Sequence, residues 1–209
     1  MRARSPEAKD ERRQRFINAA LDEFFERGYS AARMDDIARR AGFAKGTLYL
    51  YFEHKEALFN ALIETIALPN IQHIEAILQT TPNATTALQS LVEHAPLLLE
   101  QTPIPRIAKI LIADGRNFPA IAQQYRQQVI DRLLAAICQL LIRADESGEL
   151  RVEKPMLTAR LVIAPIILSA IWQVVFASDP EAEVDVHELL ALHAQLLLQA
   201  MKNPPELSV

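Results

Sequence analysis

A short stretch near the amino terminus carries side chains that suit contacts with nucleic acid. Four polar residues point away from the apolar ones around them in a helical pattern: Lys45, Thr47, Tyr49 and Tyr51. A cation, hydroxyl donors and flat rings can reach base edges and phosphates. Lys55 follows at the start of the next expected helix. The alternatives are ordinary packing for the tyrosines and a solvated surface charge for Lys55.

Two short helices joined by a tight turn would position these residues. The apolar pattern predicts a helix over 34–41, a joint at 42–44 and a second helix over 45–51, which is the spacing of a helix-turn-helix. The apolar residues that we expect to face inward are Ile37, Ala41, Phe43, Leu48 and Phe52. Ala38 and Gly42 are small where the two helices must approach each other.

Helical periodicity dominates the rest of the chain as well. Apolar residues recur on one stripe from Phe16 to Phe25, and Gly28 is expected to close that first helix in the left-handed conformation. Further helices are expected over residues 54–79, 84–100, 104–113, 118–147, 156–177 and 185–202. No segment shows the alternation of a strand. The sequence therefore predicts an all-α protein of about nine helices.

Charge is distributed unevenly along the 209 residues, whose formal net charge is −4. Residues 1–55 hold 12 Lys and Arg against 9 Asp and Glu, a net charge of +3. Residues 56–209 hold the other 10 against 17, a net charge of −7. A basic amino-terminal part thus precedes an acidic body. We expect a DNA-binding domain over 1–55, with its helix-turn-helix at about 33–52, and a second domain over 56–209.

Signatures of catalysis and of cofactor binding are missing from the sequence. The 5 glycines are too few for glycine-lined phosphate loops, and neither a P-loop nor a dinucleotide fingerprint is present. There is no G-x-S-x-G elbow and no HExxH helix, and the single cysteine, Cys138, has no evident partner. The 5 histidines lack metal-ligand spacing. We expect neither catalysis nor a cofactor nor a bound metal.

The most membrane-like stretch of the sequence runs from Leu161 to Phe176. Pro165, Ser169 and Gln173 interrupt it, and it is shorter than the ~20 apolar residues that a membrane span needs. A buried helix is the preferred interpretation. The amino terminus has arginines but lacks the apolar core of a signal peptide. We therefore expect a cytoplasmic protein with no membrane partner.

The segment from Gly28 to Phe59 resembles the signature of the tetracycline-repressor (TetR/AcrR) family. It reads GYSAARMDDIARRAGFAKGTLYLYFEHKEALF. The resemblance is strong over residues 10–60 and only general beyond them. It implies an all-helical transcription regulator with an amino-terminal three-helix domain that binds DNA. It also implies that the carboxyl-terminal helical bundle senses a ligand and forms a homodimer.

The resemblance implies a recognition helix over 45–51 in the major groove of a palindromic operator. Tyr49, Tyr51 and Lys55 would contact phosphates, and Arg33 would lie near another phosphate. The full set of expected DNA-contacting residues is Arg33, Lys45, Gly46, Thr47, Tyr49, Tyr51 and Lys55. The sequence departs from the family pattern at Ala32 and Arg33 before the first helix of the motif, and at Phe43 and Ala44 before the second. These departures remove side chains that usually cap the two helices.

A single recognition helix reads few bases, so helix-turn-helix proteins usually pair across half-sites ~34–36 Å apart or a multiple of that distance. The last two expected helices offer more apolar surface than one monomer can cover, and the resemblance implies a four-helix dimer interface there. The residues concerned are Leu161, Ile163, Ile166, Ile167, Ala170, Val174, Leu189, Leu192, Leu196, Leu197 and Ala200. A monomeric bundle core is the alternative.

The acidic body also mixes aromatic and polar residues as small-molecule pockets do. The candidate ligand contacts are His94, Arg106, Arg116, Phe118, Tyr125, Trp172 and Phe176. The resemblance implies that a small-molecule effector changes the separation of the two DNA-binding heads and releases the operator, as in a repressor. The helix begun by Lys55 and bent at Pro69 would carry the movement. A protein-binding adaptor on a helix-turn-helix scaffold is the alternative function.

Overall fold

The structure, a computed structural model, describes residues 6–202, and every regular element in this range is helical. The α-helices are α1 (Pro6–Ala31), α2 (Met34–Arg40), α3 (Lys45–Tyr49), α4 (Lys55–Leu62), α5 (Leu68–Thr80), α6 (Ala84–Gln101), α7 (Ile104–Asp114), α8 (Pro119–Tyr125), α9 (Asp131–Glu146), α10 (Pro155–Val175) and α11 (Val186–Lys202). Two π-helical segments, η1 (Ile63–Ala67) and η2 (Arg126–Ile130), join α4 to α5 and α8 to α9, and a 3₁₀ turn, η3, spans Pro180–Ala182. With the joined pairs counted once, residues 6–202 form nine helices, which confirms the predicted fold class.

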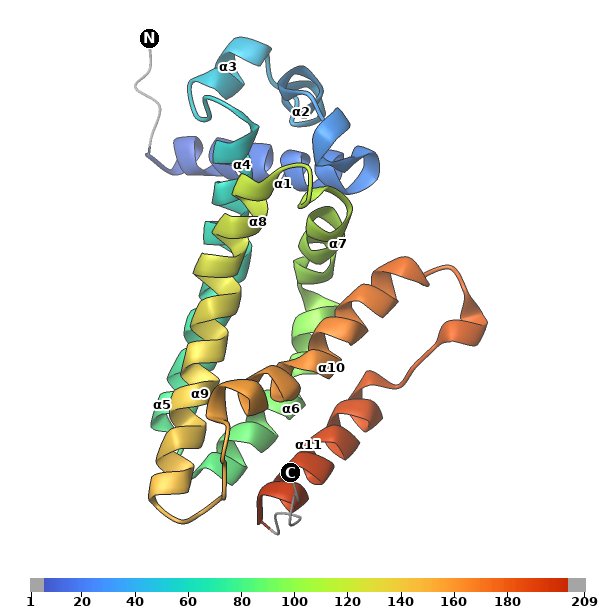
Figure 1. Cartoon of the computed structure of the whole chain (residues 1–209). Coiled ribbons are helices and arrows are strands. Elements are labelled where there is room, and N and C mark those ends of the chain that lie inside the picture. The colour runs from blue at the N-terminus through green and yellow to red at the C-terminus, as the bar shows by residue number, and fades with distance from the viewer. Residues whose placement is uncertain (1–5, 203–209) are drawn as a thin grey trace.

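The helices α1, α2 and α3 form one end of the molecule (Figure 1). From this end the continuous helix α4–η1–α5 runs beside α8–η2–α9, and α5 packs against α9. On one flank, α10 contacts α7 and α9, and α11 contacts α6. A small three-helix unit is therefore carried on a body of longer helices.

The core of the three-helix unit consists largely of the residues that the apolar pattern selects. Ile37 and Leu48 are fully buried, and Ala41 and Phe52 are nearly so. Phe43 is only partly buried and packs against the edge of this core. Burying these side chains fixes how α2 and α3 cross α1, because the apolar faces of the short helices have no other surface to cover.

Gly28 interrupts α1 in a conformation that favours glycine. Its φ of 82° and ψ of 155° are non-helical, and the chain then makes a further turn to Ala31. Gly28 has the positive φ that the prediction requires, but its ψ lies outside the left-handed helical region, and the helical segment continues three residues further than expected. The break matters because it removes Tyr29 from the regular hydrogen-bond pattern of the helix.

The hydrophobic core does not end where the sequence predicts a domain boundary. The cluster that contains Phe16 and Leu48 also contains Ile107 and Ile110 of α7 and Ile121 of α8. One hydrophobic core is therefore continuous across the predicted boundary near residue 55.

The helix α10 leaves much of its apolar surface uncovered. It is long and apolar enough to cross a membrane by length and composition, but only 28% of its most apolar window is buried within the chain. The expectation of a buried helix is therefore wrong for this chain taken alone. The exposed large apolar residues on α10 and α11 are Met156, Leu157, Leu161, Ile167, Leu168, Trp172, Val175, Leu192 and Leu196.

Candidate DNA-binding surface and effector cavity

The turn between α2 and α3 is held by an arginine from α1. Gly42 has a φ of 78°, so it reverses the chain in a conformation that other residues rarely adopt. Nη2 of Arg15 donates a hydrogen bond to the carbonyl oxygen of Ala41 at 2.8 Å. The Arg15 guanidinium also lies 4.7 Å from the centre of the Phe43 ring. Arg15 thus caps α2 and covers the aromatic side chain that replaces the usual residue of the turn.

The expected helix caps are absent from both helices of the motif. Arg33 at the amino end of α2 and Ala44 at the amino end of α3 make no side-chain capping hydrogen bond. The loss of these caps, predicted because the sequence departs from the family pattern before each helix, is confirmed. Arg33 is exposed, so its guanidinium is free to reach a phosphate beside the first turn of α2.

The helix α3, which the sequence predicts to be a recognition helix, exposes most of the residues expected to contact DNA. Lys45 and Gly46 are exposed, Thr47 is half-buried, and Tyr49 is 43% exposed. A Cβ added to Gly46 would meet no atom within 4 Å, so the backbone of α3 is open to a close approach at this position. This arrangement presents a bare turn of backbone flanked by a cation and an aromatic ring.

An acidic neighbour holds Lys45 in the free protein. Its Nζ lies 2.8 Å from a carboxylate oxygen of Asp35 in α2, and this hydrogen bond raises the pKa of Lys45. The same Nζ lies 5.9 Å from the centre of the Tyr49 ring. Because the pair is exposed, solvent screens the attraction, and Lys45 can exchange Asp35 for a phosphate at little cost.

Tyr51 and Lys55 are less available than the sequence suggests. The Tyr51 ring packs 5.5 Å from the ring of Phe16 and is half-buried. Nζ of Lys55 donates to the carbonyl oxygens of Tyr29 at 2.7 Å and of Ser30 at 3.2 Å. Burial lowers the pKa of Lys55, although the carboxylates of Glu56 and Asp114 act in the opposite direction. Their expected contacts with phosphate remain predictions.

Leu50 is a surface residue that the apolar pattern did not select. It follows α3 directly and is 79% exposed, beside Tyr49. An exposed leucine at this place can contact a thymine methyl group in the major groove. A leucine in an apolar pattern is usually assigned to the core. The sequence signal for an exposed Leu50 was its position between two tyrosines that were expected to face outward.

A largely apolar cavity of about 430 Å³ lies in the body, between α5, α6, α7, α8–η2–α9 and α10. None of the described residues that line it is an Asp, Glu, Lys or Arg. The polar residues of the lining are Asn70, His73, His94, Gln101, Thr102 and Tyr125. The volume suits a small molecule, and the lining suits one that is mostly hydrocarbon.

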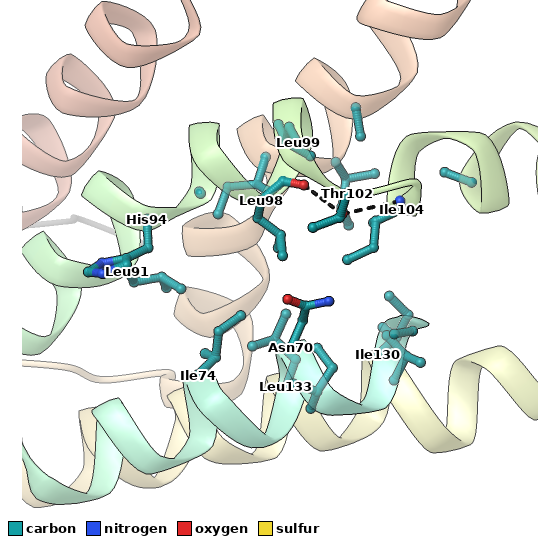
Figure 2. Close-up of a pocket in the computed structure, with 18 of the residues that line it drawn as sticks. Asn70, Ile74, Leu91, His94, Leu98, Leu99, Thr102, Ile104, Ile130 and Leu133 are labelled. Carbon is teal, nitrogen blue, oxygen red and sulfur yellow. Dashed lines mark hydrogen bonds between the residues drawn. The ribbon is translucent and has the colours of Figure 1, made fainter. Parts of the chain in front are cut away.

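The amide of Asn70 projects from α5 into the cavity, as Figure 2 shows. Its Nδ2 donates to the carbonyl oxygen of Ile66 at 2.6 Å, which leaves Oδ1 without a partner among residues 6–202. Thr102, by contrast, donates to Leu98 O at 2.6 Å and accepts from the Ile104 amide at 3.3 Å (Figure 2). Oδ1 of Asn70 is therefore able to accept a hydrogen bond from a ligand.

Of the sequence-predicted ligand contacts, His94 and Tyr125 line this cavity. Nδ1 of His94 lies 2.7 Å from the carbonyl oxygen of Ser90, and its ring centre lies 6.3 Å from that of His73. Burial raises the pKa of Tyr125 to about 12, so its hydroxyl is neutral at physiological pH. The sequence did not select Asn70, because Gln72, His73 and Glu75 follow it in the same helix and periodicity alone does not distinguish which of these polar residues faces a cavity.

The other predicted contacts lie elsewhere. Arg106 pairs with Asp22 of α1 at 2.6 Å, and the Phe118 ring packs on Tyr29 at the junction with the three-helix unit. Arg116 is exposed and does not line the cavity. The tilted rings of Trp172 and Phe176 lie with their centres 4.5 Å apart in a separate open cleft beside η3. Their helical spacing indicated a shared face but could not indicate which cavity that face lines.

No cluster of three or more His, Cys, Asp or Glu side chains that could hold a metal ion occurs within residues 6–202.

The helix-turn-helix, with an exposed second helix on a helical body, defines a DNA-binding protein of the helix-turn-helix class. A family model described as bacterial regulatory proteins of the tetR family matches residues 16–62. A second, described as the C-terminal domain of AefR-like transcriptional repressors, matches residues 86–192, just over half of the chain. The chain therefore belongs to the TetR family of transcriptional regulators.

Similar proteins extend over most of the chain. The HTH-type transcriptional regulator SrpR of Pseudomonas putida is 26% identical over 175 residues, which cover 84% of this chain and 80% of SrpR. FadR of Bacillus subtilis, solved in complex with stearoyl-CoA, gives a TM-score of 0.70 at 21% identity and covers 88% of this chain and 97% of its own. NalD, the secondary repressor of the MexAB-OprM multidrug efflux pump in Pseudomonas aeruginosa, gives a TM-score of 0.69 at 24% identity and covers 95% of this chain and 100% of its own. The two structural likenesses show the shared fold.

Proposed function

We propose that this regulator is a repressor that binds a palindromic operator as a homodimer and releases it when an apolar small molecule enters the body. The observation that carries the proposal is the cavity of about 430 Å³ without a charged residue in its described lining. The open face of α3 supplies the DNA-binding part. We further propose that the protein acts in the cytoplasm and has no catalytic activity.

The DNA contacts that we propose come mainly from α2 and α3. Lys45 would contact a phosphate beside the base edges that face α3, and Gly46 would allow a close approach of the DNA backbone. Arg33 and Tyr49 would contact phosphates on either side. Exposure of these residues supports this assignment. Thr47 and Tyr51 are half-buried and would contribute less.

The homodimer interface that we propose is formed by α10 and α11. Leu161 is 55% exposed on α10, and Leu192 and Leu196 are 53% and 57% exposed on α11. Large contiguous apolar surface of this kind is rare on monomers. Leu196→Glu should convert the dimer to a monomer in light scattering at micromolar concentration while helicity is retained. A wild-type protein that scatters as a monomer would rule out this interface.

The effector that we propose contains a hydrocarbon chain with at most one hydrogen-bonding group inside the cavity. The absence of lining carboxylates disfavours a buried cation, which would be desolvated without a counter-charge. Structural likeness to FadR, which was solved with stearoyl-CoA, supports testing acyl chains first. The spare oxygen of Asn70 would accept a hydrogen bond from the chain's polar group.

The test begins with selection of bound DNA from a random pool, which provides the operator. Stearoyl-CoA, dodecanol and dodecyltrimethylammonium are then compared for their shift of the melting temperature and for operator release. We expect the neutral alcohol and the acyl compound to bind and to release DNA, and the cation to bind least. Asn70→Leu is the matched variant, because it removes the polar group and keeps the side-chain size. Operator binding that persists with all three probes, at unchanged melting temperature, would refute the effector assignment and leave the DNA-binding assignment intact.

A further inference from the structure

Both backbone polar groups of Tyr29 are hydrogen-bonded to side chains where the three-helix unit meets the body. Its amide donates a buried hydrogen bond to Oδ2 of Asp114 at 2.7 Å. Its carbonyl oxygen accepts a hydrogen bond from Nζ of Lys55 at 2.7 Å, and the same ammonium reaches Ser30 O at 3.2 Å. Asp114 ends α7 and Lys55 begins α4, so side chains far apart in sequence meet on the two peptide groups that flank Tyr29.

The side chain of Tyr29 is held as tightly as its backbone. The ring is fully buried, and its centre lies 5.0 Å from Phe24 of α1, 6.0 Å from Phe59 of α4 and 4.9 Å from Phe118 before α8. The Lys55 ammonium lies over the same group, 4.8 Å from the Tyr29 ring and 5.8 Å from the Phe118 ring. Tyr29 therefore joins α1, α4 and the segment that follows α7.

The break at Gly28 explains why Tyr29 needs an external partner. Because the φ of 82° interrupts the helix, the Tyr29 amide is released from the usual helical bond, and a buried N–H must be satisfied elsewhere. Asp114 supplies the acceptor although it is only 7% exposed. A carboxylate at this depth is costly unless it is hydrogen-bonded, and the Tyr29 amide provides that bond. The Lys55 ammonium is near enough for the two charges to attract, because the Asp114 carboxylate opposes the lowering of the Lys55 pKa by burial.

The same contact leads directly to the effector cavity. Ala108 and Leu111 line the cavity from α7, and Asp114 follows one turn later at the end of that helix. The end of α7 lies against α1, as Figure 1 shows. A displacement of α7 by a ligand would therefore pull on the Tyr29 amide, and also on the ion pair that joins Arg106 of α7 to Asp22 of α1.

We propose that Asp114 and Lys55 act together as a clamp on Tyr29 that sets the orientation of the DNA-binding unit on the body. In this role both are positioning residues, and the Lys55 ammonium stays on the α1 carbonyls when DNA is bound instead of moving to a phosphate. The proposal extends the proposed DNA-binding function and replaces the phosphate contact that the family resemblance implies for Lys55.

The salt dependence of operator binding distinguishes a clamp from a phosphate contact. A lysine on a phosphate releases a counterion, so its loss reduces the slope of log K against log salt by about 1. A clamp residue changes the fraction of molecules with a competent head orientation, and this lowers affinity by the same factor at every salt concentration. Lys55→Met and Lys45→Met are the matched pair, because Lys45 lies on the exposed face of α3.

We expect Lys55→Met to weaken operator binding about tenfold, which is ~1.4 kcal/mol, with an unchanged salt slope. Lys45→Met should reduce the slope. Asp114→Ala should also weaken binding, although it makes the protein less negative, and Asp114→Asn should retain most of the affinity because an amide oxygen can still accept from Tyr29. The control is Asp145→Ala, which removes a similar carboxylate bond, to the Val152 amide at 2.8 Å, away from the junction.

A slope reduced by Lys55→Met as much as by Lys45→Met would overturn the proposal, as would wild-type affinity in Asp114→Ala. Hydrogen exchange of the Tyr29 amide gives a readout that needs no DNA. It should be slow in the wild type and in Asp145→Ala, and fast in Asp114→Ala. Equal protection in all three would also overturn the clamp. A wild type that protects this amide but binds no selected DNA would contradict the DNA-binding assignment and support the junction contact.

Discussion

Replacing Gly28 with alanine tests the junction through the backbone conformation that creates it. Gly28 has a φ of 82° and a ψ of 155°, a region that is essentially restricted to glycine. A Cβ at this position would lie 3.1 Å from Oδ2 of Asp114, which is tighter than ordinary contact. That oxygen cannot move freely, because it accepts the buried hydrogen bond from the Tyr29 amide. Gly28→Ala therefore imposes backbone strain and presses on the clamp at the same time.

The expected loss of stability combines these effects. A non-glycine residue in this region costs about 1–3 kcal/mol. The reduced conformational freedom of the unfolded chain returns about 0.4–1 kcal/mol. The crowded Asp114 oxygen adds a smaller penalty, so the net decrease in the free energy of unfolding should be about 2 kcal/mol. For a chain of this length, that corresponds to a melting temperature lower by about 4–8 °C.

Urea unfolding followed by circular dichroism, at one fixed protomer concentration, measures this difference. Gly148→Ala is the matched control, since Gly148 also has a positive φ, 76°, but a Cβ there would meet no atom within 4 Å. Gly28→Ala should be the more destabilising of the two. Repeating Gly28→Ala in an Asp114→Ala background should remove the part of the cost that arises from the contact.

Two results would refute the reasoning. The first is a Gly28→Ala protein whose free energy of unfolding lies within about 0.5 kcal/mol of the wild type, the usual range for a neutral surface change. The second is a cost that is identical with and without Asp114, which would show that the carboxylate does not feel the added methyl group.

Three further predictions follow from other parts of the molecule. Gly46→Ala should leave the free energy of unfolding unchanged or raise it by up to about 1 kcal/mol, because a Cβ there has open space and glycine is unfavourable inside a helix. Operator affinity should nevertheless fall in a gel-shift assay. Unchanged affinity would argue against close approach of DNA to α3. Glu149 accepts hydrogen bonds from the Ala84 and Thr85 amides at 2.8 Å each, and although burial raises its pKa, these bonds prevail and lower it. A carboxyl group with a lowered pKa stabilises the fold above the unfolded value of 4.5, and this contribution is lost as the pH falls through the folded value. Glu149→Gln should therefore cost about 1 kcal/mol at pH 7 and less as the pH falls below 4.5 in urea titrations, and a pH-independent difference would contradict this. Ala108→Phe should fill the cavity, so that stearoyl-CoA no longer shifts the melting temperature while operator binding persists; a retained shift would place the ligand elsewhere.

The helix-turn-helix could be predicted from the sequence because its information is local. The apolar spacing from Ile37 to Phe52 determines which residues are buried, and Gly42 determines where the chain turns. The all-helical class follows in the same way, because a period near 3.6 is readable within a single segment. The exposed face of α3, with Lys45 and Tyr49, follows once its buried face is known.

Only the tertiary structure decided which partner each exposed or half-buried group meets. Periodicity places Trp172 and His94 on helix faces, but the packing of separate helices determines that His94 lines the apolar cavity of the body and Trp172 lines the open cleft beside η3. The apparent phosphate ligand Lys55 bonds to carbonyl oxygens 25 and 26 residues earlier in the chain, and Asp114 reaches an amide 85 residues away. Sequence patterns record the period of one element at a time, whereas these contacts depend on how several elements are oriented in space, and that orientation is fixed only when the shared core is packed.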